Sequence, residues 1–158
     1  MAFGAIEHWE VWRLFTSRMF YCGLGGWIVA SMLKMALAWR KSRKMDFAYL
    51  FATGGMPSSH AAAATGVMFG IGYTTGFDSP ITVLAAAVAV ITMFDSVTIR
   101  RAAGEHAKWL NEIVRDIREL NFQPKRRLRE LLGHTRKEAL CGMLVGIAWA
   151  TALCLAWD

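Results

Sequence analysis

The distribution of positive charge is the feature of this chain that most limits its fold. All 18 lysine and arginine residues lie within residues 13–44 and 100–137. The stretch from Met45 to Ile99 has none, and neither has the chain after Lys137. A soluble domain would place charges along every solvated face, whereas a transmembrane helix needs about 20 mostly apolar residues. The stretches without lysine or arginine therefore predict an integral membrane protein, and an apolar fraction of 55% agrees with this.

The apolar segments predict one membrane domain over residues 1–158, an all-α polytopic bundle with about four transmembrane helices. The expected spans are residues 20–39, 58–77, 80–99 and 139–157. Residues 5–18 mix tryptophans with charges, which predicts an interfacial helix at headgroup depth. Residues 100–137 form a polar loop between the last two spans, and apolar residues at three- and four-residue steps predict that much of this loop is helical.

Small residues recur every four positions in two of the expected spans. They are Ala62, Gly66 and Gly70 in the second span, and Gly142, Gly146 and Ala150 in the fourth. This spacing lets helix backbones approach closely in lipid, so it predicts tight packing and also suits a homo-oligomer or a subunit of a membrane complex. The three cysteines show no metal-binding spacing, and neither a metal nor a cofactor is expected.

The basic loops predict the orientation of the protein. Residues 40–44 hold four cations in five positions, and residues 100–137 hold 11 cations against five acids. Such loops face the cytoplasm or its organellar equivalent, so we expect a multi-pass protein of a bacterial inner membrane or an organellar membrane. The same pattern accounts for the net charge of +6 without nucleic acid, which is not an expected partner.

The first segment with candidate catalytic residues is Gly-Gly-Met-Pro-Ser-Ser-His at residues 54–60, where the second span begins. Pro57 suits a first-turn position, and the serines can cap the free amides of the helix start. A helix start also favours a bound phosphate, and a histidine beside the anion can protonate a leaving oxygen. A capped helix with an interfacial histidine explains the same residues equally well.

The second segment is Leu-Gly-His-Thr-Arg-Lys-Glu at residues 132–138. If it is helical, His134 and Glu138 lie on one face, and the carboxylate can orient the imidazole for attack on phosphorus. An ordinary surface pair at the start of a span is the alternative. Both segments begin spans at the basic-loop end, which places His60 and His134 on one face of the membrane.

Taken together, the motifs resemble the divergent branch of the type-2 phosphatidic acid phosphatase superfamily, which also includes vanadium-dependent haloperoxidases. The resemblance covers roughly residues 30–150. It rests on the two histidine segments, on Asp95 with Arg-Arg-Ala-Ala-Gly-Glu at 100–105, on Leu110-Asn111, and on Gly142 and Gly146.

The resemblance implies roles for individual residues. His134 would be the nucleophile that forms a phosphohistidine, Glu138 would orient it, and His60 would be the general acid. The implied phosphate-binding residues are Lys34, Ser58, Ser59, Arg100, Arg101 and Arg127.

Two features depart from the pattern of the broader superfamily. Lys34 is not followed at the usual spacing by Arg-Pro, and Leu128 stands six residues before His134 where an arginine is usual. Bidentate arginines are the usual phosphate clamp, so the departures bear on activity. Asp95, a carboxylate inside an apolar run, is expected to pair with Arg100, Arg101 or Lys34 or to take part in catalysis.

Two functions follow from these expectations. The first is a metal-independent phosphatase that hydrolyses a lipid-linked phosphate or pyrophosphate, with membrane lipids as its surroundings. The alternative is a non-catalytic phospholipid-binding or structural subunit of a membrane complex. The incomplete arginine pattern favours the alternative, whereas the paired histidine motifs favour the enzyme.

Overall fold

The computed structural model describes residues 11–43, 54–117, 128 and 132–157, and in these residues the fold is all-helical. A short 3-10 helix, η1 (Val11–Thr16), precedes five α-helices. They are α1 (Arg18–Ser42), α2 (Ser59–Thr75), α3 (Pro80–Val97), α4 (Ile99–Ile117) and α5 (Arg136–Trp157). The expected interfacial helix over residues 5–18 is represented in the described part only by η1, since residues 1–10 lie outside it.

Three of the expected spans coincide with helices long and apolar enough to cross a membrane. These helices cover Arg18–Arg40, Arg136–Trp157 and the first part of a continuous stretch from Pro80 to Arg115. The remaining expected span, residues 58–77, corresponds to α2, which has 17 residues and is at the short end of the usual range. An all-α membrane bundle is confirmed, and the count of four spans is approximate.

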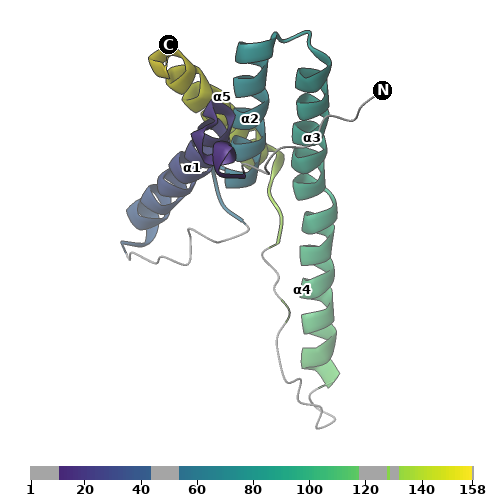
Figure 1. The fold of residues 1–158 in the computed structure, drawn as a ribbon. Helices are drawn as coiled ribbons and strands as arrows, with labels where there is room; N and C mark the ends of the chain where they lie inside the picture. Colours follow the sequence, from purple (N-terminus) through teal and green to yellow (C-terminus); the bar gives the residue numbers. More distant parts are fainter. Residues whose placement is uncertain (1–10, 44–53, 118–127, 129–131, 158) are drawn as a thin grey trace.

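The helices α1, α2 and α5 pack together, and α2 forms an antiparallel hairpin with α3 (Figure 1). The hairpin turns at Asp78 and Ser79, and Ser79 caps α3 by accepting a hydrogen bond from the Thr82 amide at 3.3 Å. Pro80 occupies the first turn of α3, where its missing N–H costs nothing. The tight reversal between these spans is thus built by an ordinary helix cap.

The core of the bundle consists of small side chains. Ala62, Gly66 and Gly146 are buried, and a Cβ on Gly146 would collide with the Ala62 carbonyl oxygen and the Thr65 hydroxyl. Thr65 also donates a hydrogen bond from α2 to the Met143 carbonyl of α5 at 3.3 Å. The small-residue faces of α2 and α5 are therefore used inside the chain, which removes them as an argument for contact with a second copy.

Large apolar side chains point away from the bundle. On α3, Leu84, Ile91 and Phe94 are 64%, 66% and 67% exposed. A soluble protein would not leave a whole helix face of this kind in water, whereas hydrocarbon lipid solvates it without penalty. Small residues inside and large apolar residues outside are the packing of an integral membrane protein.

The helix α4 continues α3 away from the bundle (Figure 1). Thr98 interrupts the two helices with a ψ of −75°, and α4 then carries four of the basic residues of the polar loop, Arg100, Arg101, Lys108 and Arg115. The chain returns beside α4, where Asn111 and Leu128 exchange two hydrogen bonds of 2.9 and 3.1 Å. Leu128 and residues 132–135 are not helical, so the helical character expected for residues 100–137 belongs to α4 within the described residues.

Candidate functional site

His134 lies in the non-helical segment that leads into α5, and its side chain is only 2% exposed. The preceding Gly133 has a φ of +84°, and a Cβ there would lie 2.5 Å from the backbone nitrogen of Arg101 and 2.8 Å from the Ser96 carbonyl oxygen. Only glycine satisfies both the backbone angle and the close approach to the α3–α4 junction. The His134 amide then donates to the Ser96 carbonyl at 2.9 Å, which fixes the histidine beside this junction.

Glu138 joins His134 to the start of α5. Its Oε2 atom accepts a hydrogen bond from the Thr135 amide at 2.8 Å, and the Thr135 hydroxyl accepts one from the Glu138 amide at 3.3 Å. This reciprocal pair is a capping box, and the Thr-x-x-Glu spacing that encodes it is visible in the sequence. The same Oε2 lies 3.4 Å from His134 Nδ1, although the two atoms are not aligned as a hydrogen bond.

The expected pairing of His134 and Glu138 thus arises from a different local structure. The prediction placed both residues on one helix face, but α5 begins at Arg136 and His134 precedes it. The capping box, rather than helical periodicity, holds the carboxylate beside the imidazole. This distinction matters because it makes Thr135 a second determinant of the geometry.

The start of α2 packs directly on the start of α5. Ser58 is the N-cap of α2, and its hydroxyl accepts from the Ala61 amide at 3.3 Å. Its own amide donates to the Glu138 carbonyl at 3.1 Å, and Gly142 leaves room for the Ser58 carbonyl. Pro57 precedes the cap, so its expected first-turn position is wrong. The two histidine segments, far apart in sequence, are thereby brought together.

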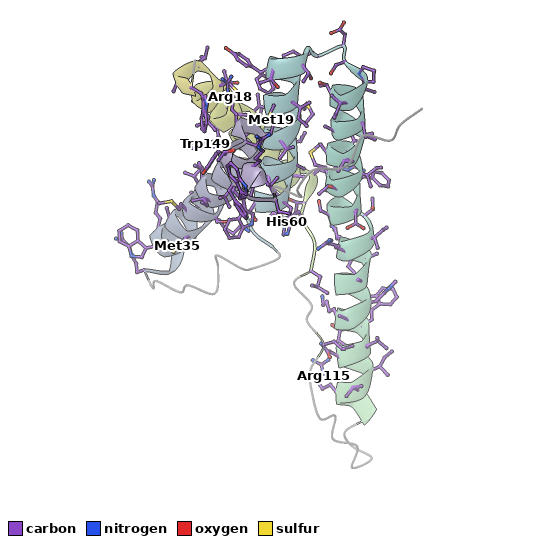
Figure 2. The ribbon with its side chains drawn as sticks, in the orientation of Figure 1. Arg18, Met19, Met35, His60, Arg115 and Trp149 are labelled. Atoms are coloured by element: carbon purple, nitrogen blue, oxygen red, sulfur yellow. The ribbon has the colours of Figure 1, made fainter. Side chains whose placement is uncertain are left out.

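The four residues predicted at the first half of the site differ in exposure. Ser58, Ser59 and Lys34 are buried, with exposed fractions of 0, 2 and 2%, whereas His60 is exposed. Figure 2 shows His60 at the start of α2, on the side of the bundle from which α4 projects. Electrostatic interactions link His134 to both His60 and Lys34, so the three side chains belong to one neighbourhood.

Burial lowers the pKa of His134 below its ordinary value of 6.5, and the nearby charge of Lys34 lowers it further. The Glu138 carboxylate acts in the opposite direction and raises this pKa, but it does not outweigh the other two. His134 is consequently neutral at pH 7. Both ring nitrogens are buried, and among the described residues neither has a hydrogen-bond partner.

A cavity of about 510 Å³ opens beside His134, Thr135 and Glu138. Its far side is formed by one face of α4, where Arg101, Glu105 and Lys108 follow one another at helical spacing. The remaining lining residues are Gly54, Gly55, Gly104, Leu132 and Gly133. Of the residues predicted for the site, Arg101, His134 and Glu138 line the cavity, and His60, Lys34, Ser58, Ser59 and Arg100 do not.

The cations near the cavity are held differently. Arg101 forms an exposed ion pair with Glu105, with Nε 3.3 Å from Oε1, and such a pair contributes only about 0.3–0.5 kcal/mol. Arg100 Nε lies 2.8 Å from Asp95 Oδ2, which is one of the pairings expected for Asp95. Lys108 was missed from sequence, although its spacing from Arg101 on the face of α4 was a usable signal. Arg127 lies outside the described residues.

The described residues contain no group of three or more His, Cys, Asp or Glu side chains placed to hold a metal ion. The side chains that the structure does bring together here are a buried imidazole, a carboxylate beside it, and two cations that line the same cavity.

Comparison with known proteins decides the relationship. Residues 15–149 match the family described as the Divergent PAP2 family. The chain belongs to the Divergent PAP2 family. It is also 39% identical over 146 residues to YuiD, an uncharacterized membrane protein of Bacillus subtilis (strain 168), and the match covers 85% of this chain and 92% of that protein. No solved structure matches the chain.

Membership of the Divergent PAP2 family confirms the resemblance found in the sequence. It establishes a membrane protein related to the type-2 phosphatidic acid phosphatases, and the helices described above give that relationship a structural form. The roles of His60, His134 and Glu138 stay predictions.

Proposed function

We propose that this Divergent PAP2 family protein hydrolyses a lipid-linked phosphate or pyrophosphate through a phosphohistidine at His134. The observation that carries the proposal is the buried imidazole of His134, which lines a cavity together with Arg101 and Lys108. A phosphate in this cavity would meet the two cations and, on the other side, the imidazole. The helices around the site support a lipid substrate, since its tail can stay in the bilayer.

The proposed reaction has two steps. Glu138 favours a proton on His134 Nδ1, so the Nε2 lone pair attacks phosphorus and the bond to the ester oxygen breaks. His60 gives its proton to the departing oxygen. Water then attacks the phosphohistidine, His60 takes the water proton, and free phosphate leaves as the phosphorus–nitrogen bond breaks. His60 does not line the cavity, so the proton must pass from His60, at the start of α2, to the leaving oxygen inside the cavity.

The phosphate clamp would differ from the predicted one. Arg101 is held by a weak exposed pair and can turn to a phosphate, whereas Arg100 is engaged by Asp95. Lys108 supplies a second cation. Lys34 is too deep to line the cavity, and its charge would act on the site through His134.

The site would face the cytoplasm or its organellar equivalent. The starts of α2 and α5 lie together at the basic end of the bundle, next to α4. The basic loops remain on that side under the positive-inside rule, which places the cavity at the leaflet they contact. This supports a bacterial inner membrane or an organellar membrane as the location.

Phosphate release from a panel of lipid phosphates and pyrophosphates by the purified protein tests the proposal. His134→Ala should abolish release, and a phosphorylated protein should accumulate in the wild type with labelled substrate. His106→Ala is the matched control, because His106 is an exposed histidine of α4 that does not line the cavity. Absence of turnover across the whole panel would overturn the enzymatic proposal.

One observation favours the second candidate, a non-catalytic phospholipid-binding subunit. The Ser58 amide is already bonded to the Glu138 carbonyl, and Ser58 and Ser59 do not line the cavity. A protein of this kind would bind lipid phosphate without releasing phosphate, and Arg101→Ala would weaken the binding.

A further inference from the structure

A second cavity, an apolar groove of about 680 Å³, adjoins the polar cavity of His134. One side is formed by α3 and the first turn of α4, and the other by the first turns of α5. Its apolar lining residues are Val90, Met93, Phe94, Val97, Ala102, Ala139 and Leu140. Thr98, Arg101, Glu105 and Arg136 complete it.

The two cavities share part of their lining. Arg101 and Glu105 line both, so the two cavities meet at the first turns of α4. Arg136 adds another cation at this end of the groove. Two cations, Arg101 and Arg136, and one acid, Glu105, therefore lie where the groove begins, and the rest of the groove is almost wholly apolar.

The groove follows α3 into the apolar part of the molecule. From Arg101 to Val90 it extends about 16 Å along the helix axis, at 1.5 Å per residue. Val90 and Phe94 are 60% and 67% exposed in the isolated chain, so the groove is open to the surrounding lipid along this length. It has the length and polarity of a hydrocarbon chain with an anionic head.

We propose that the groove binds one hydrocarbon tail of an amphiphilic phosphate ester whose head lies in the polar cavity. The inference rests on the proposed function only for the placement of the phosphate, and it holds equally for a protein that binds without turnover. A continuous path from Arg101 to Val90, cationic at one end and apolar beyond it, favours such a ligand over a second protein chain.

The bilayer determines what kind of selectivity to expect. A tail gains little from moving out of lipid into an apolar groove, because both surroundings are equally apolar. Recognition must come from packing along the groove and from the charged head. A tail too short to reach Val90 loses the packing, and a side chain that fills the groove at Val90 affects only tails that reach it.

Two valines of α3 provide a matched test. Val90 lines the groove, and Val88, two positions earlier on the opposite face of the helix, is exposed to a similar degree at 54%. The full-length protein in lipid nanodiscs would be photolabelled with hexadecyl phosphate that carries a diazirine near the tail end. Unlabelled hexadecyl phosphate, hexadecanol, butyl phosphate and inorganic phosphate would serve as competitors.

We expect labelled peptides from residues 90–97 or 139–140, with competition by hexadecyl phosphate and much less by hexadecanol. Val90→Trp should reduce labelling roughly tenfold, as a steric change in an apolar pocket does. Val88→Trp should change it less than twofold. Competition by butyl phosphate and by inorganic phosphate would show that the head is recognised apart from the tail.

Equal labelling of the Val90→Trp and Val88→Trp variants would overturn the inference. So would labelling spread along the lipid-facing side of α3, which indicates bulk lipid, or cross-linking to a second copy of the chain. Failure of the proposed function gives a different result: labelling and its loss in Val90→Trp persist, but no phosphate is released. Turnover that is equal for butyl and hexadecyl phosphate in all variants would support catalysis and reject the tail groove.

Discussion

The starts of α2 and α5 use similar caps but present their histidines in opposite ways. Ser58 caps α2 and Thr135 caps α5, each with its side-chain oxygen on an amide three residues later. His60 follows its cap and is exposed, whereas His134 precedes its cap and is 2% exposed. A residue after the cap lies on the helix surface, whereas the position of a residue before the cap is set by the segment that leads into the helix. The position relative to the cap thus separates the buried His134, the proposed nucleophile, from the exposed His60, the proposed acid.

Removing each histidine should produce the largest difference between the two helix starts. Under the proposed function, His134→Ala should lower kcat/KM at least about a thousandfold, since the nucleophile is lost. His60→Ala should lower it about a hundredfold for an alkyl phosphate, where the leaving oxygen needs a proton. Steady-state kinetics with an ester of an acidic phenol provides the check, because that leaving group needs no proton.

The acidic phenol ester should restore the kcat/KM of His60→Ala to nearly the wild-type value, because kcat/KM reports the first chemical step, and should leave His134→Ala inactive. Rescue of both variants, or of neither, would contradict the assigned division between nucleophile and acid. Circular dichroism and thermal unfolding of both variants serve as the folding control.

The next largest difference should come from replacing the glycine that precedes each cap, and it should appear in the free energy of unfolding. Gly133→Ala combines a φ of +84° with a Cβ contact of 2.5 Å to the Arg101 nitrogen, and should cost about 2–4 kcal/mol of unfolding free energy. Gly55→Ala has a φ of +92° but meets only the Lys34 side chain at 3.6 Å, so about 1 kcal/mol is expected. Equilibrium unfolding in mixed detergent measures both, and equal costs would contradict the tighter packing at Gly133.

The membrane spans could be predicted from sequence because the bilayer imposes a requirement on composition. Stretches without cations gave α2, α3 and α5 to within a few residues, and an apolar run with a single cation, Lys34, gave α1. The cap of α2 at Ser58 also followed from local chemistry. Local signals and lipid polarity are sufficient for these features.

The site itself could be predicted only in part. The spacing of His134 and Glu138 indicated their proximity, but the helix start between them was missed although Thr-x-x-Glu encodes it. The contact of Gly133 with Ser96 joins distant segments, and no local pattern specifies it. Lys108 enters the cavity because α4 continues α3 past Thr98 and the return segment lies beside it. Features of this kind depend on tertiary packing.

The carboxylate beside His134 should produce a moderate effect with a characteristic pH dependence. Glu138→Gln keeps an acceptor for the Thr135 amide, so the cap survives, but the charge that raises the pKa of His134 is lost. That pKa should fall further below its ordinary value of 6.5, and the acid limb of kcat/KM should move to lower pH. Roughly tenfold lower kcat is expected, because Glu138 no longer favours the reactive tautomer.

The lowered pKa of His134 also determines the direction in which the stability of the protein changes with pH. The folded-state pKa of His134 lies below the unfolded value, so the unfolded chain binds more protons as the pH falls. The stability contributed by neutral His134 is complete above pH 6.5 and is lost as the pH falls toward the folded-state pKa. Unfolding free energies of wild type and His134→Gln should therefore converge on acidification.

The smallest expected effect, and the sharpest comparison of the two helix starts, comes from the caps. Thr135→Ala and Ser58→Ala each remove one side-chain acceptor and should cost about 1 kcal/mol of unfolding free energy. Only Thr135→Ala should also disturb the carboxylate beside His134, because Glu138 is the other half of that capping box. The acid limb of kcat/KM should then shift toward that of Glu138→Gln, and Thr135→Ser should restore the wild-type profile. A pH profile unchanged by Thr135→Ala would mean that Glu138 keeps its place without the cap, and the position of His134 would then depend on Gly133 and the Ser96 carbonyl alone.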